Sequence, residues 1–154
     1  MPQTWNLPLT GTCRCAQVRF SVGAPALMTM ACHCTGCQRM TGSAYSLGAM
    51  VPAEALTVLA GEPVIGGLHG ATRHLFCPHC MSWLFTQPEG VSGFINVRAT
   101  LFDDTRWFAP FIETMTCEKL PWARTPAVHS FERWPDADAF EPLIREFAAW
   151  APRF

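Results

Sequence analysis

Cys32, Cys34 and Cys37 form a Cys-x-Cys-x-x-Cys pattern, so three thiols fall within six positions of the chain. Thiolates this close repel one another, and they are stable together when a soft cation lies between them. Zinc is the usual such cation, bound by four ligands at about 2.3 Å from sulfur. Three protein ligands leave one position open, as in a catalytic zinc site, whereas a fourth from elsewhere makes the site structural. The spacing alone leaves both alternatives open.

Cys77 and Cys80 form a second ligand pattern, the Cys-x-x-Cys spacing of a zinc knuckle. A knuckle needs two further ligands, and the Cys-x-Cys pair of Cys13 and Cys15 has the spacing to supply them. A metal bound by both pairs closes a loop of more than 60 residues, so it restrains a large part of the chain. Four unrelated core thiols are the alternative, which the two ligand spacings disfavour.

The composition favours a small globular protein rich in short strands and turns. The chain has 154 residues, which indicates one domain over 1–154, and it is 49% hydrophobic and 15% charged, with 13 Pro and 11 Gly. Its net charge of −1 and the absence of a Lys/Arg run exclude a nucleic-acid-binding footprint. No apolar stretch is a credible membrane helix. We therefore expect neither a nucleic acid nor a membrane as partner.

The eight cysteines are expected to be metal ligands rather than members of four disulfides. The first residues carry neither the basic nor the apolar segment of a secretory signal, which indicates a reducing, cytoplasmic location. Cys117 has no partner at ligand spacing and is expected to be a free thiol.

A succession of short strands must position these cysteines. Alternating apolar residues at Val18, Phe20 and Val22 predict a half-buried strand directly after Cys15. Residues 1–11 are expected to be an irregular lead-in. Further strands are predicted over 27–31, 43–51, 56–60, 72–76, 82–87, 94–97 and 111–116, with a helical turn over 35–41.

The C-terminal region has a helical pattern instead. Phe140, Leu143, Ile144 and Phe147 follow one another at i, i+3, i+4 and i+7, which predicts an amphipathic helix from about residue 138 to 150. We expect its apolar stripe to pack on the β core.

The ordered set of motifs resembles the family of glutathione-dependent formaldehyde-activating enzymes, from about residue 11 to 122. The motifs are Gly-x-Cys-x-Cys from Gly11, Cys-His-Cys-x-x-Cys from Cys32, Thr-Gly-Ser-Ala from Thr41, Phe-Cys-Pro-x-Cys from Phe76, and Pro-Trp from Pro121. Each motif is weak alone, but their order is specific.

This resemblance implies a mainly β fold, the β-tent, in which small antiparallel sheets are pinned by zinc; the C-terminal helix lies beyond the usual pattern. It implies carbon–sulfur lyase chemistry on S-hydroxymethylglutathione, the adduct of glutathione with formaldehyde, or on a similar adduct of a small thiol and a small aldehyde. His33, between two of the cysteines, is the candidate for moving the proton. The ligands carried over from the family are Cys13, Cys15, Cys77 and Cys80 for a structural zinc, and Cys32, Cys34 and Cys37 for a second, catalytic zinc.

Three positions depart from the family pattern. Ala16 and Met81 stand where the family usually has glycine, and the residue type of Met81 argues against the usual left-handed turn. Gln38 replaces a common arginine beside Cys37, which removes a charge that could meet a substrate carboxylate.

Two other classes of protein are alternatives to the enzyme. In the first, both metals only hold the fold, and the protein is a non-catalytic zinc-stabilised module that binds a protein partner. In the second, disfavoured, the cysteines carry iron for electron transfer. The sequence leaves the oligomeric state open, a homodimer included.

Overall fold

The computed structural model describes residues 3–150, which form two compact units. The three-cysteine unit comprises residues 3–4, 27–49 and 107–150, and it contains Cys32, Cys34 and Cys37. The four-cysteine unit comprises residues 5–26 and 50–106, and it contains the other two cysteine pairs. The chain passes from one unit to the other within strand β4 (Ser46–Pro52). The expectation of one domain over 1–154 stays a prediction.

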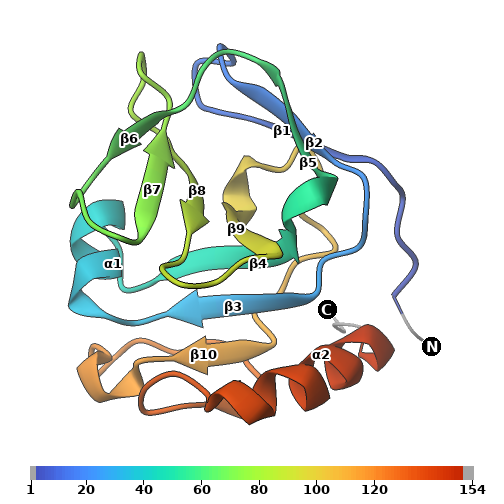
Figure 1. Cartoon of the computed structure of the whole chain (residues 1–154). Coiled ribbons are helices and arrows are strands. Elements are labelled where there is room, and N and C mark those ends of the chain that lie inside the picture. The colour runs from blue at the N-terminus through green and yellow to red at the C-terminus, as the bar shows by residue number, and fades with distance from the viewer. Residues whose placement is uncertain (1–2, 151–154) are drawn as a thin grey trace. The chain divides into compact units, whose positions relative to one another are not determined.

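The four-cysteine unit is built from two antiparallel sets of strands (Figure 1). One set has the order β1-β2-β5, and the other has the order β9-β8-β7-β6. Their bounds are β1 Leu9–Thr12, β2 Arg19–Val22, β5 Leu56–Ala60, β6 Val64–Gly66, β7 Arg73–Phe76, β8 Trp83–Gln87 and β9 Phe94–Arg98, with short 3-10 turns at Ala53–Ala55 and Ala99–Leu101.

The core of the four-cysteine unit is centred on Phe20. Its buried ring meets Phe85 edge-on at 5.3 Å between ring centroids, and Phe102 in the same way at 5.5 Å. Gly11 lies against the same ring, where a Cβ atom would approach the Leu101 carbonyl oxygen to 2.6 Å. The motif glycine before Cys13 is therefore required by close packing.

The three-cysteine unit is a mixed set of strands flanked by helices. The strand order is β11-β10-β3-β4, and β10 runs parallel to both β3 and β11. Every residue of β3 is buried. The elements are β3 Met28–Cys32, α1 Thr35–Thr41, β10 Ile112–Thr114, β11 His129–Ser130 and α2 Phe140–Ala149, with 3-10 turns at Thr116–Glu118 and Ala137–Ala139.

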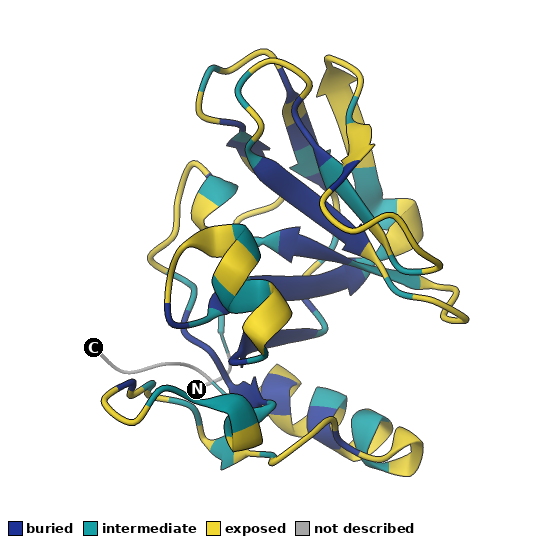
Figure 2. Ribbon diagram, turned by 90° about the vertical axis from the view of Figure 1, so that its left-hand side faces the viewer, coloured by how far each residue is buried: buried dark blue, intermediate teal, exposed yellow. Residues whose placement is uncertain are grey.

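Helix α2 packs on the strands of its own unit, alongside β10 (Figure 1). Leu143 and Phe147 are buried, while the opposite face is exposed, as Figure 2 shows. The Phe147 ring lies 5.5 Å from that of Phe111, directly before β10. Pro142 lies in the first turn of the helix, where its missing N–H removes no hydrogen bond.

Most of the expected architecture is confirmed. The fold is mainly β with antiparallel sheets and a C-terminal helix, and the buried part of the predicted helical stripe packs on β structure. The predicted helical turn over 35–41 is α1, which ends at Gly42 with a left-handed φ of 63°. No helix within residues 3–150 has the length and apolar character needed to span a membrane.

Three parts of the expectation were wrong or incomplete. The expected irregular lead-in over 1–11 contains the start of strand β1. Gly11 lies inside this strand and interrupts the residue pattern that would have predicted it. Strands β6 and β11 are three and two residues long, too short to show alternation. The pairing of β10 with β3 and with β11 is parallel, a feature that the expectation of small antiparallel sheets did not include.

Candidate metal centres

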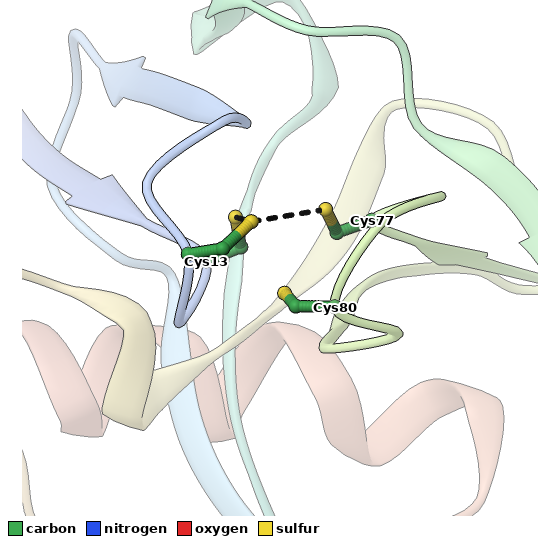
Figure 3. Close-up of side chains that lie close together, drawn as sticks. Cys13, Cys77 and Cys80 are labelled. Atoms are coloured by element: carbon green, nitrogen blue, oxygen red, sulfur yellow. Dashed lines mark hydrogen bonds between the residues drawn. The ribbon is translucent and has the colours of Figure 1, made fainter.

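The four thiols of Cys13, Cys15, Cys77 and Cys80 lie within 4.8 Å of one another (Figure 3). The Sγ atoms of Cys13 and Cys15 are 3.5 Å apart, and those of Cys15 and Cys77 are 3.7 Å apart. A tetrahedron with metal–sulfur bonds of about 2.3 Å has sulfur–sulfur edges of roughly 3.8 Å. The cluster therefore has the donor set and the size to hold a zinc-like ion, and it forms a candidate metal site.

Two similar turns present the ligands of this cluster. In one, Cys13 N–H donates to the Val18 carbonyl and Ala16 N–H donates to the Cys13 carbonyl, both at 3.0 Å. In the other, Cys77 N–H donates to the Ser82 carbonyl and Met81 N–H donates to the Cys77 carbonyl, also at 3.0 Å. Each turn folds a pair of thiols to one side.

Both turns contain a residue in the left-handed backbone region. Ala16 has a φ of 63° and Met81 a φ of 58°, although neither is glycine. The inference from the residue type of Met81 was therefore wrong, because the turn is present. A residue with a side chain costs about 1–2 kcal/mol in this backbone region. The two turns that bring the thiols together therefore contain local backbone strain.

The thiol pKa values show that this cluster does not ionise uniformly. The Ser82 hydroxyl donates toward Cys80 and lowers the pKa of that thiol to about 5. The Gln17 backbone N–H acts to lower the pKa of Cys15, but burial and the neighbouring thiols raise it to about 12. Four thiolates at this spacing therefore need a cation among them.

The Cys32, Cys34 and Cys37 thiols form the second cluster, again within 4.8 Å of one another. Cys32 is the last residue of β3, Cys34 is the N-cap of α1, and Cys37 lies in the first turn of that helix. The Cys34 sulfur accepts a hydrogen bond from Cys37 N–H at 3.3 Å. Cys32 is buried and the other two are half-buried, so the cluster can be reached from solvent.

The second cluster also resists full ionisation. Hydrogen bonds from Cys32 and then Cys37 lower the pKa of Cys34 to about 2. The same contacts raise the pKa of Cys37, chiefly through Cys32, and raise that of Cys32, chiefly through Cys34. One thiolate is thus stabilised by two thiols, and three thiolates together require a bound cation.

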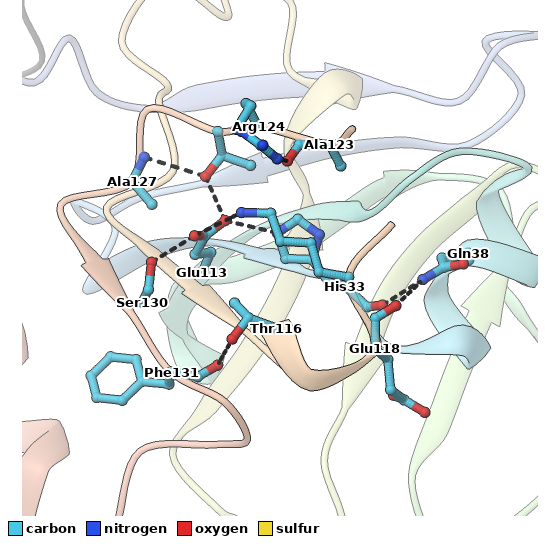
Figure 4. A network of polar contacts seen from close by, with 12 residues as sticks. His33, Gln38, Glu113, Thr116, Glu118, Ala123, Arg124, Ala127, Ser130 and Phe131 are labelled. Atoms are coloured by element: carbon cyan, nitrogen blue, oxygen red, sulfur yellow. Dashed lines mark hydrogen bonds and ion pairs between the residues drawn. The ribbon is translucent and has the colours of Figure 1, made fainter. Parts of the chain in front are cut away.

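Sequence reasoning missed the buried carboxylate behind this cluster. Glu113 in β10 accepts a hydrogen bond from His33 Nε2 at 2.8 Å (Figure 4). It also accepts from Ser130 Oγ at 2.6 Å, from Thr125 Oγ1 at 2.8 Å, and from Lys119 Nζ at 3.1 Å on each oxygen. One signal was available, because a charged residue inside a predicted buried strand needs partners.

Gln38 joins the cysteine segment to the segment after β10 (Figure 4). Its side-chain amide donates to the His33 carbonyl at 2.7 Å and to the Glu118 carbonyl at 3.0 Å. The Glu118 carboxylate in turn accepts from the Thr35 N–H and hydroxyl, both at 3.3 Å. The glutamine that replaces the family's arginine is therefore engaged in holding α1.

Each predicted ligand set is brought together, and the remaining thiol is not. Cys117 is exposed and lies outside both clusters. The ring of His33 is fully buried, and its Nδ1 has no hydrogen-bond partner among the residues that the structure describes. The assignment of zinc to each set, and of a proton-carrying role to His33, stays a prediction.

Both the sequence and the architecture of this protein are similar to those of known proteins. The family model described as glutathione-dependent formaldehyde-activating enzyme matches residues 8–118, which is most of the chain. The protein belongs to this family. No curated protein gives a significant match. A crystal structure of a Rhodobacter sphaeroides protein, a structural genomics target, is similar in fold: it is 22% identical, with a TM-score of 0.51, over 61% of this chain and 87% of that one.

Proposed function

We propose that this protein is a zinc-dependent carbon–sulfur lyase acting on adducts of a small thiol with a small aldehyde, glutathione and formaldehyde first among them. The observation that carries this proposal is the cluster of three thiols. Among residues 3–150, no fourth His, Cys, Asp or Glu joins Cys32, Cys34 and Cys37. A metal held by these three keeps one position for an exogenous ligand, the arrangement of catalytic zinc sites. Membership of the family supports the same chemistry.

When bound, zinc would lower the pKa of an incoming thiol and favour its thiolate at neutral pH. In the direction of addition, the sulfur forms a bond with the carbonyl carbon, and the proton lost from the thiol ends on the carbonyl oxygen. Cleavage of the adduct is the reverse. The role proposed for Cys32, Cys34 and Cys37 is to hold the metal at the half-buried end of β3 and the start of α1.

His33 is proposed as the carrier of that proton. The Glu113 carboxylate, whose pKa is about 2, only accepts hydrogen bonds at neutral pH, so His33 Nε2 donates to it. The other nitrogen, Nδ1, is buried without a partner among the described residues. A histidine whose one nitrogen is held by a carboxylate presents the other as acid or base, which is the logic of carboxylate–histidine pairs.

The proposed role of Cys13, Cys15, Cys77 and Cys80 is a closed structural zinc shell. All four ligands come from the protein, and their two turns belong to segments 62 residues apart in the chain. A metal there would hold these segments together and would take no part in the chemistry.

The test is metal analysis combined with an activity screen of glutathione with formaldehyde. The wild type should contain two zinc equivalents and interconvert the adduct. Cys34→Ser should lose one equivalent and the activity while staying folded. Cys117→Ser is the matched control, because it removes an exposed thiol outside both clusters, and it should behave as the wild type.

A cobalt-substituted protein separates this proposal from its rival, the non-catalytic module that binds a protein partner. Glutathione should change the cobalt absorption spectrum of the wild type, because its thiol takes the open position. An unchanged spectrum, together with no turnover of any thiol–aldehyde adduct, would contradict the enzyme and favour the module.

A further inference from the structure

The Glu113 carboxylate is buried and fully engaged. The residue is 6% exposed, and its two oxygens accept five hydrogen bonds from four side chains. These partners lie on separate segments: His33 after β3, Lys119 after the 3-10 turn, Thr125 in the following loop, and Ser130 in β11. An ionised carboxylate with this many donors has a fixed position, because moving it would leave a buried charge unpaired.

Of these four partners, only His33 belongs to the cysteine segment. It stands between Cys32 and Cys34, so its backbone sets the separation and direction of the two thiols. His33 N–H donates to the Thr114 carbonyl at 3.0 Å, and the His33 ring meets Tyr45 edge-on at 5.3 Å between centroids. The hydrogen bond to Glu113 completes the restraint, since it fixes the side chain as well as the backbone.

Lys119 already supplies the counter-charge that a buried carboxylate requires. Its Nζ lies 3.1 Å from both oxygens of Glu113, and the lysine side chain is only 20% exposed. Ser130 and Thr125 supply two further neutral donors. Lys119, Ser130 and Thr125 thus provide the counter-charge and hydrogen-bond donors that the buried carboxylate requires. Its contact with His33 serves a different purpose from neutralising charge.

We infer that Glu113 is a positioning residue for the three-cysteine metal site, acting through His33 to set the affinity and geometry with which Cys32, Cys34 and Cys37 bind their metal. The inference rests on the proposed metal at this cluster, and it does not depend on the identity of the substrate. Partners behind a metal site that orient its ligands commonly change metal affinity by 10- to 100-fold when they are replaced.

The experiment is a cobalt titration of the purified full chain, with Cys34→Ser as the blank that isolates the signal of the three-cysteine site. Glu113→Gln keeps the shape of the side chain but loses its charge and one acceptor. It should bind cobalt at this site at least tenfold more weakly than the wild type, with a shifted ligand-field band. The four-cysteine site should keep its affinity.

Two variants separate positioning from general loss of stability. Thr125→Ala removes one donor to Glu113 and leaves the contact with His33, so it should lower the melting temperature and change cobalt affinity by less than threefold. Glu141→Gln makes the same chemical change on the exposed surface of α2 and should match the wild type. If Glu113→Gln does not fold, His33→Gln breaks the same contact from the other side and should show the same loss of affinity.

The outcomes distinguish this inference from the proposed function. Equal cobalt affinity and equal spectra in folded Glu113→Gln and the wild type overturn the positioning role and leave the enzyme proposal standing. A wild type without activity on any thiol–aldehyde adduct, but with the expected loss of cobalt affinity in Glu113→Gln, overturns the enzyme and supports the positioning role. A wild type whose three-cysteine cluster takes up no cobalt overturns both.

Discussion

His33 Nε2 lies 2.8 Å from Glu113 Oε2, although 80 positions separate the two residues in the sequence. The parallel pairing of β10 with β3 produces this contact, because it sets Glu113 opposite Ala31 and Thr114 opposite Cys32. The segment with the three cysteines therefore begins at the end of β3, and the neighbouring strand β10 carries the Glu113 carboxylate. We therefore expect both the acid stability of the protein and metal binding at the three-cysteine cluster to depend on this register.

The three-cysteine metal should be the more labile of the two. Three thiolates on a divalent ion in a half-buried site leave an open position, whereas four protein thiolates form a closed shell. Brief chelation of freshly reduced protein should remove one zinc equivalent and any thiol–aldehyde activity, with an unchanged far-UV circular dichroism spectrum. Loss of the fold together with the first equivalent, or two tightly bound metals in Cys34→Ser, would contradict this order.

Glu113 should make the stability of the protein depend on acid pH. Although burial opposes it, the hydrogen bonds from Ser130, Thr125, His33 and Lys119 lower the pKa of Glu113 from 4.5 to about 2. A carboxyl group with a lowered pKa in the folded state stabilises fully above its unfolded pKa, and this contribution is lost as the pH falls toward the folded value. The difference corresponds to about 3 kcal/mol at neutral pH.

The measurement is the free energy of unfolding of the wild type and Glu113→Gln by urea, from pH 6 to pH 2.5. The gap between the two proteins should be largest above about pH 5 and should shrink as the pH falls, by the linkage of protonation to folding. Both proteins are compared after brief chelation has removed the three-cysteine metal, because Glu113→Gln is expected to bind that metal more weakly; acid release of the four-cysteine metal, whose affinity should be the same in both, then cancels in the difference. A gap independent of pH would exclude the charged state of Glu113 as its cause.

Phe147 should be a major source of stability for the three-cysteine unit. It is 3% exposed and contacts Phe111 and Trp150, at 5.5 and 5.9 Å between ring centroids. Phe147→Ala should reduce the free energy of unfolding by about 3–5 kcal/mol, through lost burial and a new cavity. Arg145→Ala, on the exposed face of the same helix, should change it by less than about 0.5 kcal/mol. Equal midpoints for the two variants would show α2 to be an accessory.

Met81→Gly should stabilise the protein. Met81 as a whole residue is 56% exposed, so removal of its side chain gives up little burial, while glycine relieves the strain of a φ of 58°. The relief of about 1–2 kcal/mol exceeds the entropy that glycine adds to the unfolded chain, so the net gain should be about 0.5–1 kcal/mol. Met81→Ala keeps the strain and is the matched control. A lower melting temperature for the glycine variant than for the alanine variant would contradict this account.

Several features were determined by the sequence alone, because they depend on residues close together in the chain. The Cys-x-Cys and Cys-x-x-Cys spacings predicted that the thiols within each motif lie close together, since a short loop between two ligands leaves few conformations that place them apart. The helical periodicity from Phe140 to Phe147 predicted α2 and its buried side for the same reason. The helical turn that Gly42 ends was also readable from local sequence.

Other features were decided only by the tertiary structure. Glycine preference is a weak guide where metal-ligand turns impose their own backbone, so Ala16 and Met81 adopt a conformation that their residue types disfavour. The contacts of Glu113 with His33 and of Gln38 with the Glu118 carbonyl each join segments 80 positions apart, which the parallel register of β10 and β3 brings together. Register is read from the sequence where buried and exposed residues alternate, but β3 and β10 are buried along their whole length, so neither strand has an alternation that fixes their pairing. The sequence therefore predicted the thiols of the three-cysteine site, whereas the carboxylate and amide that hold their segment became visible only in the folded chain.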